Sequence, residues 1–232
     1  MRRDKSFSEV NDMIKKELFV NPNGFDIPYL VYLPDDYDES KTYPMIVFLH
    51  GYGETGPTDG SKVEKVAVHG PFFEIETKGR SFPCIIVGPQ CPETTIWYGC
   101  MESLIGFVKY AIDKYPADKK RVSLTGLSMG GYGSFLLGQC APELFSAVAP
   151  VCGGGVCWYG FKLKDKPVWA FHGDCDGTVP PYESLNMVKH INQAGGHAKV
   201  TFVPGVGHDV WRGVYADSEI YDWLLGQENK DI

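Results

Sequence analysis

The segment Gly126-Leu127-Ser128-Met129-Gly130 places a serine between two glycines in the pattern G-x-S-x-G. A short apolar run at residues 122–125 leads into it, and a helix-capable stretch at residues 132–140 follows. A sharp strand-to-helix turn of this kind, a nucleophile elbow, exposes the serine hydroxyl above a sheet, while the glycines let strand and helix pass closely. The sequence therefore predicts Ser128 as a catalytic nucleophile. The alternative, a glycine-rich helix start with a solvent-facing serine, does not explain the motifs below.

A nucleophilic serine needs a base that accepts its proton, and the chain has six histidines. Five of them lie in a predicted helix, beside strand-like runs or in an irregular stretch, where structural or exposed roles are more typical: His50, His69, His172, His190 and His197. His208 instead ends a glycine-rich loop, residues 204–208, directly after the last strand-like run. Such a loop can fold back over the strand ends towards the serine. We therefore expect His208 to be the base.

The base must be oriented by a third group, and residues 171–180 offer two carboxylates after another strand-like run. Asp176 lies deeper in this loop than Asp174 and is followed by Gly177. We expect Asp176 to orient His208 and Asp174 to cap the turn, with the reverse assignment as the alternative. The predicted triad is Ser128, Asp176 and His208, in that order along the chain.

An acyl-transfer site also needs N–H donors for the oxyanion of its tetrahedral intermediate. One donor is expected from the residue after the nucleophile, Met129, and the other from a loop after an early strand. The segment Leu49-His50-Gly51-Tyr52-Gly53 follows such a strand and has glycines that let N–H groups turn towards one point. We expect the backbone N–H groups of Tyr52 and Met129 to form the oxyanion hole.

The elements that must position these residues alternate between strand and helix patterns after about residue 40. Short apolar runs predict strands at residues 43–49, 82–87, 121–125, 145–150, 167–171 and 198–203. One-sided apolar spacing or helix-capable composition predicts helices at residues 101–115, 132–140, 182–194 and 218–225. Two further strand-like runs, residues 17–20 and 28–33, flank a turn-rich tetrad and predict an antiparallel hairpin at the sheet edge.

This alternation predicts an α/β fold with a mostly parallel sheet, helices on both faces and an antiparallel N-terminal hairpin. We expect one domain over residues 1–232 without a large lid. The polar stretch at residues 54–81 is expected to be an irregular insertion at the rim of the site.

Composition excludes several classes of partner. A net charge of −7 and scattered cations argue against nucleic-acid binding. No apolar stretch is long enough to span a membrane, and residues 1–16 lack a secretory signal. We therefore expect a cytoplasmic protein, with secretion as the alternative if a signal has been removed. The seven cysteines include Cys91 with Cys100 and Cys152 with Cys157, but their spacing does not match a zinc ribbon. We therefore expect free thiols and no metal.

The chain resembles the α/β-hydrolase superfamily along its whole length, in particular a bacterial esterase branch. That branch includes feruloyl esterases, polyhydroxybutyrate-depolymerase-like enzymes and prolyl-oligopeptidase-like serine hydrolases. The matching motifs are LHGYGETG from Leu49, HGPFF from His69, GPQCP from Gly88, TGLSMGGYGS from Thr125, APVCGGG from Ala149, HGDCDGTVP from His172 and GVGHDVW from Gly205. The resemblance implies the same triad and oxyanion pair, the α/β-hydrolase fold and no cofactor.

The resemblance further implies hydrolysis of a small-molecule or carbohydrate-linked ester, with short-chain or feruloyl-type acyl groups expected. Residues 90–97 would then form a pocket wall, where Trp97 stacks on a flat acyl group or, as the alternative, covers the edge of the core. Thioesterase and peptidase activity remain open because they use the same chemistry. A non-catalytic binding protein with this fold is the alternative from another class.

Overall fold

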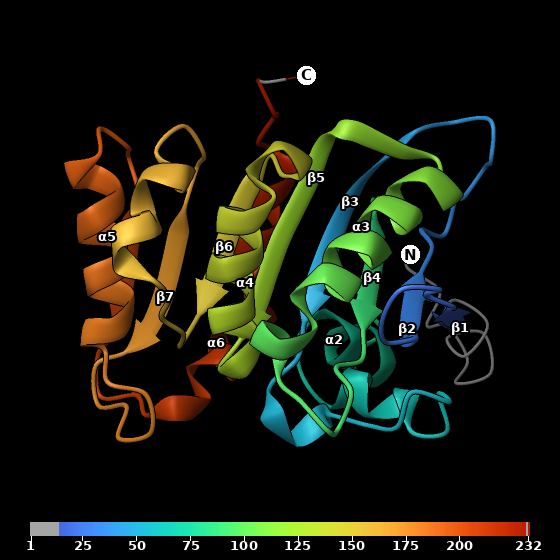
Figure 1. Ribbon diagram of the computed structural model, residues 1–232, viewed down its shortest axis with the longest axis horizontal. Coiled ribbons are helices and arrows are strands. Elements are labelled where there is room, and N and C mark those ends of the chain that lie inside the picture. The colour runs from blue at the N-terminus through green and yellow to red at the C-terminus, as the bar shows by residue number, and fades with distance from the viewer. Residues whose placement is uncertain (1–13, 231) are drawn as a thin grey trace, which may run out of the picture.

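In the part of the chain that the structure describes, eight strands form one sheet in the order β1-β2-β4-β3-β5-β6-β7-β8 (Figure 1). The computed structural model describes residues 14–230 and residue 232, so most of the polar N-terminal segment considered above lies outside the described residues. The strands are β1 (Ile14–Phe19), β2 (Ile27–Tyr32), β3 (Tyr43–Leu49), β4 (Ile85–Pro89), β5 (Ala117–Leu127), β6 (Ala147–Val151), β7 (Trp169–Gly173) and β8 (Lys199–Val203).

Strand directions divide the sheet into a short antiparallel end and a long parallel part. β1 pairs antiparallel with β2, and β2 pairs antiparallel with β4. All later neighbours, from β4 and β3 to β7 and β8, run parallel. This arrangement confirms the mostly parallel sheet and the N-terminal hairpin at its edge.

The parallel strands form because their residues are apolar on both faces. β4, β6 and β7 are buried at every position, whereas the edge strand β8 has no fully buried residue. Continuous apolar runs are typical of strands covered by helices on both sides.

Two layers of helices provide that cover (Figure 1). One face carries α3 (Met101–Lys114), α4 (Met129–Cys140) and α5 (Tyr182–Gln193), and the other carries α2 (Gly70–Lys78), α6 (Trp211–Ala216) and α7 (Glu219–Leu225). α3 shows the principle, since Leu104, Phe107, Val108 and Ala111 are buried along one side of the helix. Within residues 14–230, no helix is both long and apolar enough to cross a bilayer.

The expectation of an irregular insertion at residues 54–81 is wrong in its second half, which forms α2. Pro71 lies in the first turn of this helix, where its missing N–H costs nothing, and Gly79 ends it in the left-handed region at φ 63°. Phe72 and Ile75 fix the helix to the sheet because both are buried. Glycine and proline here mark the ends of a helix and not a loop.

The parallel strands deliver the predicted site residues to one edge of the sheet. Ser128 directly follows β5, Asp176 lies three residues after β7, and His208 lies five residues after β8. Because these strands run parallel, their carboxyl ends meet at the same edge, which is where ligands bind in open α/β sheets.

Candidate active site

The turn around Ser128 has the backbone strain expected of a nucleophile elbow. Ser128 adopts φ 53° and ψ −115°, a backbone conformation that residues other than glycine rarely adopt. The turn also requires close backbone contact, because a Cβ on Gly130 would lie 2.0 Å from the carbonyl oxygen of Leu49. Strain of this kind persists only where surrounding structure enforces it, and it is concentrated at functional sites.

A continuous hydrogen-bond chain joins the three predicted triad residues. Ser128 Oγ lies 2.9 Å from His208 Nε2, and His208 Nδ1 lies 2.7 Å from Asp176 Oδ2. The imidazole of His208 also packs edge-on against Trp211, with ring centroids 5.2 Å apart at 90°. In this arrangement Nδ1–H donates to the carboxylate, and Nε2 faces the serine hydroxyl as an acceptor.

The carboxylate of Asp176 is fixed at both oxygens. Its Oδ1 accepts hydrogen bonds from the backbone N–H groups of Thr178 (2.8 Å) and Val179 (2.9 Å). Burial alone would raise the pKa of Asp176, but the hydrogen bonds from His208 and these two N–H groups outweigh it and lower the pKa. Asp174 is exposed and accepts a hydrogen bond from Gly205 N–H at 2.7 Å, so it joins two loops and does not contact His208.

A second histidine, His172, lies against the same carboxylate. Its Nε2 is 3.2 Å from Asp176 Oδ2 and 3.0 Å from the carbonyl oxygen of Val179, and its Nδ1 is 2.8 Å from Ser184 Oγ. Burial lowers the pKa of His172, although the neighbouring Asp176 opposes that effect. The sequence indicated only that His172 braces a loop, because its contact with Asp176 depends on how residues 173–179 fold back.

The two expected oxyanion donors lie at the starts of helical turns beside the elbow. Tyr52 begins the 3₁₀ turn Tyr52–Glu54, and Met129 begins α4. The N–H of a first helical residue has no acceptor within its own helix, so both groups can bind an external oxygen. The close approach of Gly130 to the carbonyl of Leu49 brings the two segments together. The Tyr52 ring is 68% exposed at the same place.

Trp97 does not line an open pocket, contrary to the expectation that it stacks on an acyl group. It has no exposed surface, and its indole Nε1–H donates to the carbonyl oxygen of His50 at 3.1 Å. His50 is itself buried, with a pKa lowered to about 4 by burial, and its Nε2 accepts a hydrogen bond from Cys91 N–H at 2.9 Å. Trp97 therefore holds the segment that carries Tyr52 in place through the carbonyl of His50. This agrees with the alternative that Trp97 covers the edge of the core.

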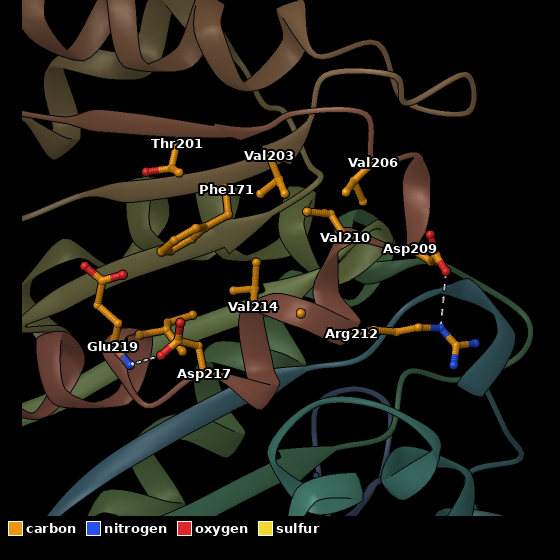
Figure 2. Close-up of a pocket in the computed structure, with 12 residues that line it drawn as sticks. Phe171, Thr201, Val203, Val206, Asp209, Val210, Arg212, Val214, Asp217 and Glu219 are labelled. Carbon is orange, nitrogen blue, oxygen red and sulfur yellow. Dashed lines mark hydrogen bonds and ion pairs between the residues drawn. The ribbon is translucent and has the colours of Figure 1, made fainter.

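A cavity of about 430 Å³ lies beside Asp209, on the α6 side of the sheet (Figure 2). Its floor is apolar and includes Phe171, Val203 and Val214, while Asp209 and Arg212 form an ion pair at its rim. Ser128 is not among its lining residues. The chemistry suggested by the triad is therefore not located in this cavity.

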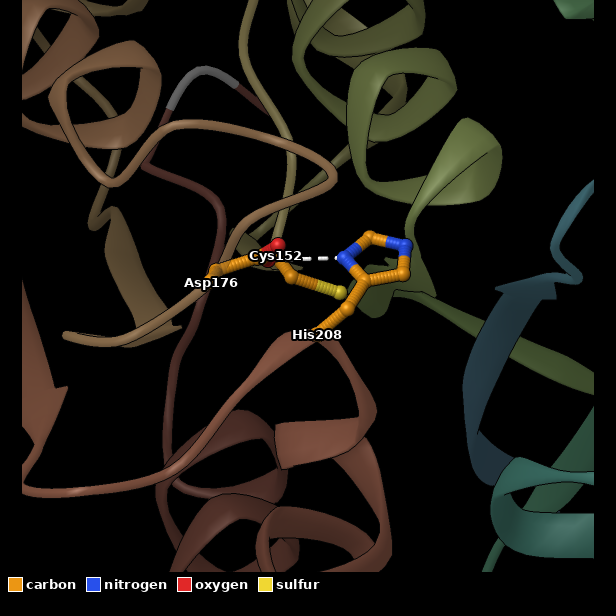
Figure 3. Close-up of side chains that lie close together, drawn as sticks. All are labelled: Cys152, Asp176 and His208. Atoms are coloured by element: carbon orange, nitrogen blue, oxygen red, sulfur yellow. Dashed lines mark hydrogen bonds and ion pairs between the residues drawn. The ribbon is translucent and has the colours of Figure 1, made fainter.

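The triad has a thiol beside it that the sequence did not assign to the site. Figure 3 shows the Cys152 side chain next to the imidazole of His208, and the ligating atoms of Cys152, Asp176 and His208 all lie within 4.8 Å of one another. Such a set could hold a metal ion, but the carboxylate and Nδ1 already bind each other here. Burial also raises the pKa of the Cys152 thiol, which disfavours the thiolate that metals prefer. The geometry therefore fits a triad better than a metal site.

Known proteins share both sequence and structure with this chain. The family model described as Esterase matches residues 104–199, a stretch that contains Ser128 and Asp176. Feruloyl esterase B of Neurospora crassa is 31% identical over 135 residues, which cover 56% of this chain and 45% of that protein. Venom dipeptidyl peptidase 4 of Vespa velutina is 28% identical over 152 residues, covering 59% of this chain and 19% of that protein.

Structural similarity extends over nearly the whole chain. The crystal structure of a thermostable esterase matches with a TM-score of 0.80 at 31% identity, covering 95% of this chain and 64% of that one. The chain thus spans less than half the length of the two curated relatives and about two thirds of the esterase structure. The sheet order, the elbow and the match at 31% identity show the α/β-hydrolase fold, and residues 104–199 are similar to the Esterase family.

Proposed function

We propose that this chain is a carboxylic-ester hydrolase that works through an acyl-enzyme on Ser128. The observation that carries the proposal is the hydrogen-bond chain from Asp176 through His208 to Ser128, at 2.7 Å and 2.9 Å. The match to the Esterase family supports it independently. The reaction uses the chain's own side chains and backbone in every step.

The first half-reaction acylates the serine. As Ser128 Oγ attacks the ester carbonyl carbon, His208 Nε2 takes the hydroxyl proton, and Asp176 stabilises the imidazolium through Nδ1–H. The carbonyl oxygen becomes an oxyanion, which the N–H groups of Tyr52 and Met129 bind. The intermediate then collapses, the bond to the alcohol oxygen breaks, and His208 gives its proton to the leaving alcohol.

The second half-reaction repeats these roles with water. His208 removes a proton from a water molecule whose oxygen attacks the acyl carbon, and the resulting oxyanion occupies the same hole. When this intermediate collapses, Ser128 Oγ recovers the proton from His208 and the carboxylic acid is released. One ester and one water thus give one acid and one alcohol.

We further propose short-chain or feruloyl-type esters, including carbohydrate-linked ones, as substrates. Feruloyl esterase B, at 31% identity, supports a planar aromatic acyl group. The Tyr52 ring, 68% exposed beside an expected oxyanion donor, offers an aromatic surface to such a group. Because Trp97 is buried, the proposed preference depends on Tyr52 and not on Trp97.

A panel of esters tests both parts of this proposal. Purified protein would be assayed on p-nitrophenyl acetate, p-nitrophenyl octanoate and methyl ferulate, with fluorophosphonate labelling mapped to its residue. We expect labelling at Ser128 and the highest kcat/KM on acetate or ferulate. Labelling elsewhere would overturn the mechanism, and a preference for octanoate would overturn the substrate class alone. Tyr52→Ala should lower kcat/KM several-fold more for methyl ferulate than for acetate.

A peptidase is the second candidate, favoured by the 28% identity with a dipeptidyl peptidase. The same triad can cleave an amide, since attack and proton transfer follow the same course. Dipeptide p-nitroanilides distinguish the two activities. A kcat/KM on these amides above that on every ester of the panel would replace the esterase proposal by the peptidase one.

A further inference from the structure

Two buried thiols, one after β4 and one before α3, lie close to each other. Cys91 follows β4, and Cys100 precedes the first residue of α3. Their sulfur atoms lie 3.9 Å apart, with Cys91 fully buried and Cys100 3% exposed. A disulfide bond is about 2.05 Å long, so side-chain rotation over a short distance would bring the sulfurs into bonding range.

The segment between these cysteines, residues 92–99, is tied to the oxyanion loop at several points. Cys91 N–H donates to His50 Nε2 at 2.9 Å, and Cys91 C=O accepts from Gly56 N–H at 3.1 Å. Trp97, inside the segment, donates to the carbonyl of His50 at 3.1 Å. A covalent bond between Cys91 and Cys100 would close residues 91–100 into a ring. This ring would contain the residues that hydrogen-bond to His50 and Gly56.

We propose that Cys91 and Cys100 form a dithiol site that a small peroxide-class oxidant converts to an intramolecular disulfide. The inference is independent of the proposed esterase function, because none of the triad atoms takes part.

The two sulfurs have unequal roles in this oxidation. The hydrogen bond between the two thiols lowers the pKa of Cys100, and the same bond together with burial raises the pKa of Cys91. Thiolate character and exposure set the rate of attack on an oxidant. Cys100, which is slightly exposed, therefore reacts first, and Cys91 resolves the product.

The chemistry balances with hydrogen peroxide as the oxidant. The Cys100 thiolate attacks one peroxide oxygen, the O–O bond breaks, and the leaving hydroxide takes up a proton to give water. The sulfur of Cys91 then attacks the sulfenic sulfur of Cys100, forming the S–S bond, while the S–O bond breaks. The hydroxide released takes the Cys91 proton as a second water. Two thiols and one peroxide thus give one disulfide and two waters.

The effect of the disulfide would appear as added thermal stability. Closing a loop of this length restricts the unfolded chain, so we expect the crosslink to raise Tm by roughly 5 °C or more for a chain of this size. None of the triad atoms takes part in the crosslink, so we expect kcat on p-nitrophenyl acetate to change less than about threefold.

The experiment uses the full chain carrying Cys140→Ala and Cys175→Ala, which remove the two exposed thiols. Protein treated with hydrogen peroxide, and protein kept in a reducing phosphine, would be alkylated under denaturing conditions and mapped by mass spectrometry. We expect a peptide pair linked through Cys91 and Cys100 with the loss of two hydrogen masses, and a higher Tm, both reversed by the phosphine.

Matched variants separate this bridge from general oxidation. Cys91→Ala should abolish the rise in Tm, whereas Cys84→Ala, which removes another fully buried thiol, should keep it. The mapping of the parent protein decides the question even if Cys91→Ala does not fold. Alkylation of both Cys91 and Cys100 after peroxide treatment, or a bridge to Cys84 or Cys152 in place of theirs, would overturn the proposal.

Discussion

Asp176→Asn gives the sharpest test of the triad, because the structure determines how the asparagine must sit. Asp176 Oδ1 accepts two backbone N–H groups, from Thr178 and Val179. We expect the amide oxygen of an asparagine to take that place, since the two backbone donors there are fixed, whereas the ring proton of His208 can move to its other nitrogen. Its NH₂ group would therefore replace Oδ2, which now lies 2.7 Å from His208 Nδ1.

This orientation forces His208 into the wrong tautomer. An NH₂ facing Nδ1 favours a lone pair on Nδ1 and the proton on Nε2, so Nε2 no longer accepts from Ser128 Oγ 2.9 Å away. Tautomer inversion of this kind lowers kcat by about 10⁴-fold in serine hydrolases, or about 5.5 kcal/mol at 1.36 kcal/mol per factor of ten. The side-chain volume is unchanged, so the fold should be kept.

The assay measures kcat on p-nitrophenyl acetate. Circular dichroism is used to check that each variant is folded, and kcat is calculated per mole of folded protein. Asp174→Asn is the matched control, because Asp174 is exposed and its carboxylate accepts from the N–H of Gly205 in place of the ring of His208; we expect its kcat within about threefold of wild type. A loss below tenfold for Asp176→Asn would refute the assigned orientation of His208. A large loss for Asp174→Asn alone would move the role of the acid to Asp174.

The remaining predictions concern the elbow and acid pH. Ser128→Ala should lower kcat by about a million-fold while the circular dichroism spectrum stays unchanged. Gly130→Ala should lower Tm and activity together, because its Cβ would lie 2.0 Å from the Leu49 carbonyl oxygen; wild-type Tm would contradict the close contact. The pKa of Asp176 is lowered in the folded state, so its contribution to the free energy of unfolding is present above about pH 4 and is lost as pH falls through the lower, folded-state pKa. Wild-type Tm should therefore fall more steeply below pH 4 than that of Asp176→Asn, and parallel curves would count against this coupling.

Burial made the existence of each parallel strand predictable, but the bounds of β4, β6 and β7 differ from the expected ones by up to three residues. The predicted and observed bounds of β3 (Tyr43–Leu49) agree. β5 (Ala117–Leu127) begins four residues earlier than expected, because Ala117 pairs with Tyr43 at the start of β3. The polar residues 118–121 lie in the register shift that follows this pair, so they interrupt the apolar pattern by which a strand is recognised.

The site was predictable as far as its chemistry depends on local motifs. The elbow and the loops after β7 and β8 could be identified because glycine spacing and strand ends are local features. The burial of Trp97 and the contact of His172 with Asp176 could not, since each depends on how a loop folds against a distant segment. The thiol–thiol contact of Cys91 and Cys100 likewise depends on where α3 begins relative to β4.

Because the strands differ in burial, the backbone that carries Ser128 is more stable against local opening than the backbone that carries His208. Ser128 follows β5, whose last six residues are all buried between β3 and β6, whereas His208 follows β8, an edge strand with no fully buried residue. Local opening of a protein begins where few apolar contacts hold the backbone, so amide hydrogens of β8 should exchange with solvent faster than those of β5. On heating, the base should leave the serine before the sheet melts, and hydrolysis should stop at a temperature below the cooperative loss of secondary structure.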